Sequence, residues 1–488
     1  MISINKRKVA IFMEEQMNDP FRPVNPRRRK RTKIQIFKEA YLPALIVAVA
    51  LILIVVFIIG SITRAVQKNK AEKEASIAES SSIAAEEARL AQEVQDLIAK
   101  SKTFAANYDY PSAIALLNSF SGDISKYPTL NDQILEYETA QKALVAWDDP
   151  SAIPNLSFQL LVADPSRGFS HDTYGYAINR NFITTEEFSR ILQQLYDNGY
   201  ILVDLDDFIT SEVGTDGTTF YQAKPLYLPK GKKPIMLTQT NVNYNYYLID
   251  SDGDNVPDAE GTGIASKLLW DGANFTCELV DASGNTVTGA YDMVPILESF
   301  IKKHPDFSYR GAKAILALTG YNGLFGYRTH ESAKDIFGES AYNQAVQDAK
   351  KVADALRQNG YTLACYTYEN IAYGESSLTQ IQNDMNGWTS EVVPILGNID
   401  ILAYAQLSDI TEDFSYSGEK YQALRDLGFR YYLGFCDDGQ TWTTIAGDYV
   451  RQGRILVTGS SLTHHADWFA NLFDAASVLD SSRENVPQ

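Results

Sequence analysis

Residues 232–247 read KKPIMLTQTNVNYNYY. The apolar run Pro234–Thr238 has the length of a buried β-strand, and polar and aromatic residues follow directly after it. Comparable short runs occur at 200–205 (YILVDL), 314–318 (AILAL), 361–366 (YTLACY) and 399–404 (IDILAY). Strands that alternate with helices from residue 153 onward predict a parallel α/β sheet or barrel. Barrels place their chemistry at the C-terminal ends of the strands, so a site is expected there.

The helices between these strands have recognisable start and stop signals. Thr184-Thr185-Glu186-Glu187 fits a capping box, and Asn198-Gly199 ends the helix that it begins. Two further helices are expected over residues 342–358 and 378–395. The domain formed by these strands and helices is expected to occupy residues 149–488.

Two segments at the N-terminus indicate a membrane anchor. Residues 1–39 carry eleven Lys and Arg against four Asp and Glu, and residues 40–62 contain no charged side chain. An apolar run of about 20 residues is what a transmembrane helix needs, and it exceeds the apolar core of a signal peptide. The basic flank predicts a cytoplasmic tail at 1–39, one transmembrane helix at 40–62 and an extracellular C-terminal domain. We therefore expect a single-pass protein of the cell membrane.

The basic tail is also compatible with binding to nucleic acid. Beside a membrane span, however, such a cluster is expected to set topology and to contact anionic lipid, so no nucleic-acid partner is predicted.

Residues 63–148 are expected to be helical. The segment 64–102 is rich in Ala, Glu, Lys and Gln and contains neither Pro nor Gly, which predicts a solvated helical stalk. Two amphipathic segments within 104–147, separated by a Gly/Asp/Pro break, predict a helical hairpin. Asp148-Asp149-Pro150 is expected to end this region.

Composition limits the class of protein. The 488 residues have a net charge of −18, with 45% hydrophobic and 21% charged residues, which excludes a disordered, collagen-like or disulfide-stapled chain. Three widely spaced cysteines, Cys277, Cys365 and Cys436, fit neither a disulfide framework nor a cysteine-based zinc site.

Several motifs of the last domain resemble those of the NodB-type polysaccharide deacetylases (carbohydrate esterase family 4), in the membrane-anchored form of Gram-positive bacteria. The resemblance covers residues 153–480 and rests on IPNLSFQLLVADPSRGF, KKPIMLTQTNVNYNYY, YDMVPILESFIKKHPDFSYRGAKAILALTGYNGLFGYRT, GYTLACYTYEN, GDYVRQGR and LFDAASVLD. It implies a distorted (β/α) barrel. It also implies that active members bind one zinc-like divalent metal and remove acetyl groups from chitin, peptidoglycan or similar glycans.

The positions that match the family's catalytic motifs carry other residues here. The family's base and metal-binding carboxylates are matched by Thr240 and Asn241, and its two metal-binding histidines by Tyr366 and Asn370. Gln159 stands where the first motif strand usually has a histidine. These neutral groups do not compensate the charge of a divalent ion, so no zinc is expected at the family site. We expect an inactive domain that binds cell-wall polysaccharide or an envelope protein.

Two other functions stay open. One is an active deacetylase with a rearranged metal site, for which His464 in GSSLTHHAD is the first substitute ligand to test. The other is a structural spacer.

A second metal signal lies in the loop DSDGDNVPD, residues 250–258. Acids at its first, third, fifth and ninth positions have the spacing by which a tight loop directs oxygens at one calcium ion; they are Asp250, Asp252, Asp254 and Asp258. The loop resembles the acidic loops of thrombospondin type 3 and dockerin-like calcium sites. Asn255 occupies the sharp-turn position and tolerates left-handed backbone. A plain acidic surface loop is the alternative.

Aromatic residues at or after the predicted strand ends could stack on sugar rings. The candidates for a glycan groove are Tyr244, Tyr321, Tyr327, Tyr368 and Tyr404. Ordinary packing is the other explanation for these tyrosines.

Overall fold

The computed structural model describes residues 70–170, 172–411, 415–483 and 486–487. The predicted cytoplasmic tail and the predicted transmembrane helix at 40–62 lie outside these residues. Within the described ranges, no helix combines the length and apolar character needed to cross a membrane.

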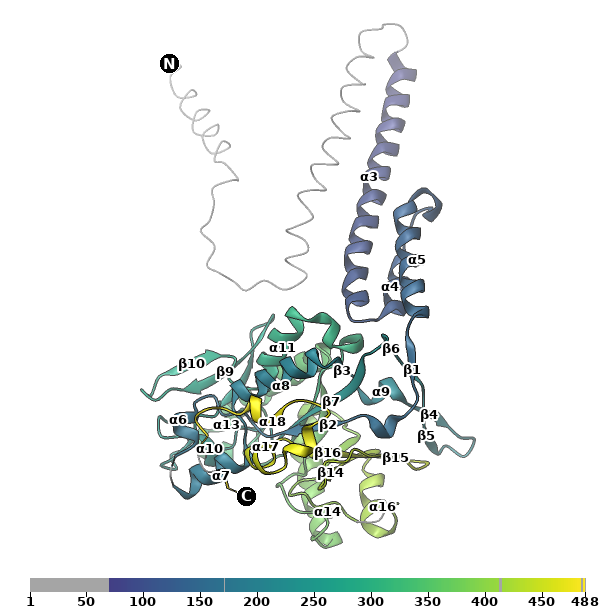
Figure 1. The fold of residues 1–488 in the computed structure, drawn as a ribbon. Helices are drawn as coiled ribbons and strands as arrows, with labels where there is room; N and C mark the ends of the chain where they lie inside the picture. Colours follow the sequence, from purple (N-terminus) through teal and green to yellow (C-terminus); the bar gives the residue numbers. More distant parts are fainter. Residues whose placement is uncertain (1–69, 171, 412–414, 484–485, 488) are drawn as a thin grey trace, which may run out of the picture. The chain divides into compact units, whose positions relative to one another are not determined.

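From Lys70 onward, three α-helices precede the barrel: α3 (Lys70–Ala106), α4 (Tyr110–Asn118) and α5 (Pro128–Lys142). Figure 1 shows α3 alongside α4 and α5, and the buried side chains of Val94, Leu117 and Leu130 form their shared core. The helical region ends at Lys142 and not at Asp148, because residues 145–147 form strand β1 (Val145–Trp147), which pairs with β6 (Leu226–Leu228).

Seven parallel strands close into a barrel, which confirms the (β/α) barrel predicted from the sequence. They are β2 (Asn155–Phe158), β7 (Lys233–Thr240), β11 (Ala314–Leu318), β12 (Thr362–Cys365), β13 (Ile401–Ala403), β14 (Tyr431–Cys436) and β16 (Val450–Leu456). The order around the barrel is β7, β11, β12, β13, β14, β16, β2 and back to β7. Strand β3 (Tyr200–Leu202) pairs in parallel with the first half of β7, and β15 (Thr443–Ile445) pairs antiparallel with β16.

Side chains alternate between the inside and the outside of the barrel, as strand geometry requires. Met236, Ile315 and Ala364 belong to the interior core, whereas their neighbours Leu237 and Leu316 belong to the core between strands and helices.

A row of three hydrogen-bonded polar side chains crosses the interior of the barrel. The Thr238 hydroxyl donates to Asn155 Oδ1 at 2.7 Å, and Asn155 Nδ2 donates to Gln452 Oε1 at 2.9 Å. These three side chains satisfy one another between the apolar base of the barrel and its C-terminal mouth.

The outer helices cover the barrel strands (Figure 1). The longer ones are α7 (Thr173–Asn181), α8 (Thr185–Asp197), α11 (Met293–Lys303), α13 (Glu339–Gln358), α14 (Leu378–Gly387) and α16 (Gly418–Asp426). The shorter ones are α6 (Pro165–Gly168), α9 (Leu205–Phe208), α10 (Tyr246–Ile249), α12 (Ala333–Phe337), α15 (Val393–Leu396), α17 (Gly459–His464) and α18 (Ala475–Val478). The predicted capping box of α8 is confirmed: the Thr184 hydroxyl accepts from the Glu187 amide, and the Glu187 carboxylate accepts from the Thr184 amide.

Besides the β1–β6 and β15–β16 pairs, two further antiparallel additions were not predicted. A three-stranded sheet consists of β8 (Lys267–Trp270), β9 (Phe275–Val280) and β10 (Thr286–Gly289), and a hairpin consists of β4 (Ile209–Val213) and β5 (Thr219–Ala223).

Candidate functional site

A cleft of about 460 Å³ opens at the C-terminal mouth of the barrel. Its walls are the ends of β2, β7, β12 and β16, the loop after β13, and helix α7. The polar and aromatic residues that line it are Ser157, Phe158, Gln159, Tyr174, Asn181, Phe182, Thr240, Asn241, Tyr247, Tyr366, Asn370, Gln406, Arg454 and Thr458. The five positions that match the family's catalytic motifs are therefore brought together in one cavity.

Thr240 and Asn241, which follow each other at the end of β7, both have hydrogen-bond partners within the protein. The Thr240 hydroxyl donates to the Phe158 carbonyl at 3.2 Å. Asn241 Nδ2 donates to the Tyr247 hydroxyl at 3.3 Å, and Asn241 Oδ1 accepts from Asn245 Nδ2 at 3.0 Å. A hydroxyl that donates to the backbone is not arranged as a base, and the amide oxygen of Asn241 is neutral and already accepts one hydrogen bond.

Tyr366 and Asn370 come from the end of β12 and the turn after it. Burial raises the pKa of the Tyr366 phenol, and the positive charge of Arg454 opposes this shift. The phenol therefore stays protonated at neutral pH and does not offer an anionic ligand. Asn370 Oδ1 has no hydrogen-bond partner among the described residues.

Left-handed backbone is concentrated around this cleft. Positive φ angles occur at Asn241 (61°), Thr367 (61°), Asn370 (58°), Gln406 (54°) and Leu407 (54°). Such conformations are costly for side-chain-bearing residues, most of all for a β-branched residue such as Thr367, and they cluster at functional sites. The strained turns after β7, β12 and β13 support the choice of this cleft as the candidate site.

Arg454 is the one charged side chain of the cleft lining, and its residue is 1% exposed. Its Nε donates to the Gly434 carbonyl at 2.9 Å, and its Nη2 donates to the Tyr404 carbonyl at 2.8 Å. Its Nη1 has no hydrogen-bond partner among the described residues. Burial lowers the pKa of Arg454, but a guanidinium stays charged in proteins.

Two tyrosines form the exposed aromatic part of the lining. Tyr247 is 47% exposed and Tyr174 is 43% exposed, and the Tyr174 hydroxyl donates to the Tyr247 carbonyl. Tyr174 was not predicted, because it lies on helix α7 and no strand-end pattern marks it. Neither was Arg454, which appears only as part of the motif GDYVRQGR.

Two of the five glycan-binding tyrosines predicted from the sequence are wrong, because Tyr244 and Tyr404 are fully buried. The Tyr244 hydroxyl donates to the Asp292 carboxylate at 2.6 Å, and Asp292 also accepts from the Leu161 amide. Tyr404 lies among other buried aromatic rings, 6.3 Å from the ring of Tyr432. Both tyrosines are packing residues.

The other three predicted tyrosines, all of which the structure describes, lie outside the residues that line the cleft. Tyr368 is buried, and Tyr321 is 44% exposed. Tyr327 lines a separate cavity of about 350 Å³ beside the sheet of β8, β9 and β10.

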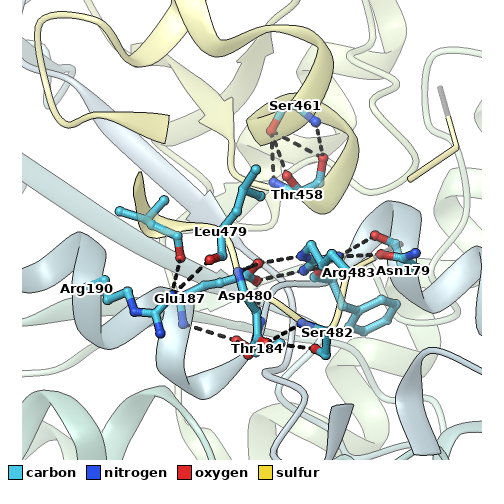
Figure 2. A network of polar contacts seen from close by, with 12 residues as sticks. Asn179, Thr184, Glu187, Arg190, Thr458, Ser461, Leu479, Asp480, Ser482 and Arg483 are labelled. Carbon is cyan, nitrogen blue, oxygen red and sulfur yellow. Dashed lines mark hydrogen bonds and ion pairs between the residues drawn. The ribbon is translucent and has the colours of Figure 1, made fainter. Parts of the chain in front are cut away.

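The C-terminal segment ties helix α7, which forms one wall of the cleft, to helix α8. Figure 2 shows Arg483 between Asn179 of α7 and Glu187 of α8. Arg483 Nη2 donates to Glu187 Oε2 at 2.7 Å, and its Nη1 donates to both the carbonyl and Oδ1 of Asn179, each at 2.7 Å. The Asp480 amide donates to Glu187 Oε1 at 2.9 Å. We refer to Asn179, Glu187, Asp480 and Arg483 as the C-terminal clamp.

His464, the substitute ligand considered from the sequence, is exposed and lies outside the residues that line the cleft. Its Nε2 is 2.9 Å from the Val486 carbonyl. The described residues therefore do not bring this imidazole to the positions that match the family's metal site.

The acidic loop after α10 brings three of its four aspartates together. Oxygens of Asp250, Asp252 and Asp254 lie within 4.8 Å of one another, and this is the one group among the described residues with the composition and spacing of a metal site. Asp258 does not join them, because its carboxylate accepts from the amide and the hydroxyl of Ser251, at 2.8 and 2.7 Å. Asn255 has the expected left-handed backbone, with φ 66°.

Comparisons with known proteins add one structural likeness. No protein-family model and no curated protein matches the sequence. The solved structure of the Streptococcus pyogenes deacetylase PplD in complex with acetate is similar, with 13% identity and a TM-score of 0.33, over 65% of this chain and 94% of that chain.

Proposed function

We propose that this protein is a membrane-anchored, extracellular glycan-binding protein whose barrel mouth holds a cell-wall sugar without hydrolysing it. The observation that carries the proposal is the lining of the cleft. Among its described residues are hydrogen-bonding amides and hydroxyls, two exposed tyrosines and one arginine, but neither a carboxylate nor an imidazole. Sugars are recognised by such polar groups together with aromatic faces.

The size of the cleft supports the same function. Its volume of about 460 Å³ falls within the range of about 300–1,000 Å³ that small-molecule sites occupy. Tyr174 and Tyr247 supply apolar surface at its rim, and Gln159, Asn370 and Gln406 supply amide groups that can contact sugar hydroxyls.

The hydrogen bonds inside the cleft favour binding over metal-dependent deacetylation. Such hydrolysis requires about three metal ligands and a base. The Thr240 hydroxyl donates a hydrogen bond to the Phe158 carbonyl. Both the nitrogen and the oxygen of the Asn241 amide form hydrogen bonds within the protein. The resemblance to polysaccharide deacetylases then supports the class of ligand, a wall glycan, while its hydrolytic chemistry is not proposed for this chain.

The test compares two tyrosines of similar exposure. Tyr247 (47% exposed) lines the cleft, and Tyr321 (44% exposed) does not. The full-length protein is titrated with chitotriose and with soluble peptidoglycan fragments in a calorimeter. We expect Tyr247→Ala to weaken binding about fivefold or more, since loss of a sugar-stacking ring costs about 1 kcal/mol or more, and Tyr321→Ala to bind like the wild type.

The proposal is contradicted if neither glycan binds the wild type. It is also contradicted if Tyr321→Ala and Tyr247→Ala weaken binding equally, because the site would then not be this cleft.

A further inference from the structure

Arg454 is an incompletely satisfied cation inside the candidate cleft. It is almost fully buried, and Nε and Nη2 donate to carbonyls, while Nη1 has no partner among the described residues. A buried charged group without a full set of partners is unfavourable, and native proteins seldom retain one without a function.

No acidic side chain of the described cleft lining offers Nη1 a counter-ion. Asp409 is the one carboxylate whose charge acts on Arg454 among the described residues. Its carboxylate already pairs with Arg451 Nη2 at 2.8 Å and accepts from the Tyr416 hydroxyl at 2.8 Å. In a protein of net charge −18, the cleft is thus a local positive site.

Two further buried polar groups of the same lining have no hydrogen-bond partner within the part of the chain that the structure describes. They are the Ser157 hydroxyl, at the end of β2, and Asn370 Oδ1. A hydroxyl can donate to an anion or bind a sugar hydroxyl, and an amide oxygen accepts only from a donor such as a sugar hydroxyl. The unused groups of the cleft therefore complement a ligand that has both an anionic group and hydroxyls.

We propose that the cleft selects a carboxylate-bearing sugar, whose carboxylate accepts from Arg454 Nη1. This inference rests on the proposed glycan-binding function and adds the chemical class of the glycan. A carboxylate suits the site better than a phosphate because the lining provides one positive charge and one unpartnered guanidinium nitrogen. A phosphate monoester carries close to two negative charges at neutral pH and has three strong acceptor oxygens.

The test compares an acidic sugar with its uncharged methyl ester, and adds a phosphorylated sugar and a neutral oligosaccharide for reference. The full-length protein is titrated with trigalacturonic acid, with its methyl ester, with galactose 6-phosphate and with the neutral chitotriose. We expect the acid to bind at least about tenfold more tightly than the ester, since hydrogen bonds between charged groups inside a low-dielectric site are strong. The preference should persist at raised salt, because buried pairs are screened weakly.

Variants locate the contact. Arg454→Met should remove the preference for the acid over the ester, and Arg454→Lys should retain only part of it, because an ammonium lacks the planar fork of the guanidinium. Arg180→Met is the matched control: Arg180 is exposed on α7 and lies outside the lining, so its removal changes net charge equally without removing the contact.

Equal binding of acid and ester by the wild type would overturn the inference, even if Arg454→Met does not fold. So would tighter binding of galactose 6-phosphate, or an equal loss of preference in Arg180→Met. If chitotriose still binds in these cases, the proposed glycan-binding function stands. If no sugar binds, both fail.

Discussion

The C-terminal clamp yields a prediction about stability. Glu187 and Arg483 form a salt bridge whose side chains are 0% and 2% exposed, so the Arg483→Met variant leaves a buried carboxylate without its cation. Breaking a buried pair from one side costs about 3–5 kcal/mol. Arg483 also donates to the Asn179 and Phe182 carbonyls, which would lose a charged donor. We therefore expect the free energy of unfolding to fall by at least 3 kcal/mol.

A double-mutant cycle separates the energy of the Glu187–Arg483 interaction from the other effects of each substitution. Glu187→Leu alone leaves Arg483 buried and removes the acceptor of the Thr184 amide at 2.7 Å, so it is also expected to be strongly destabilising. The double variant should cost less than the sum of the two single variants, because neither charge is then left alone. Urea unfolding of the full-length protein, followed by circular dichroism, measures each free energy.

The control is an exposed ion pair. Lys351 pairs with Asp348 at 2.9 Å with side chains 67% and 32% exposed, so Lys351→Met should cost less than about 1 kcal/mol. A loss in Arg483→Met no larger than in Lys351→Met would refute the reasoning that this clamp holds α7 and α8.

Three further outcomes are expected. Millimolar calcium should raise the melting temperature and Asp252→Ala should abolish that increment; identical melting with calcium and with chelator would leave a plain acidic loop at this place. A protease added to intact cells should degrade the chain after Ile62 and spare an epitope before Arg31, and protection of the large domain would contradict the orientation. Burial raises the pKa of Asp207 to about 7, so the folded state binds an extra proton between about pH 4 and 7 and loses stability as the pH rises through this window. Asp207→Asn should therefore be more stable than the wild type at pH 8 by about 1 kcal/mol or more in urea unfolding, and no gain would contradict that pKa.

The sequence predicts best those strands that are continuous apolar runs bounded by polar turns. β7, β11 and β12 are short apolar runs between polar turns, so they could be located before the structure was known. β16 could not, because it reads VRQGRIL and places polar side chains inside the barrel. The sheet of β8, β9 and β10 was missed because its strands are only partly buried.

The candidate site shows a similar division. Thr240 and Tyr366 could be placed in one cavity because both follow predicted parallel strands, whose ends meet at the barrel mouth. Tyr244 and Tyr404 could not be told apart from exposed rings, since the side on which a strand-end residue points depends on local backbone, such as φ 52° at Tyr244. The role of Arg454 depends on which nitrogens have partners, and no sequence pattern contains that information.

The most direct test of binding without hydrolysis is acetate release. The full-length protein is incubated with acetylated chito-oligomers and peptidoglycan fragments, with zinc, cobalt or manganese supplied. Because Thr240, Asn241, Tyr366 and Asn370 offer no carboxylate or imidazole, we expect no acetate above a no-protein control while the same glycans bind. Wild-type turnover that a chelator stops would contradict the account, since it would require metal ligands outside this cleft.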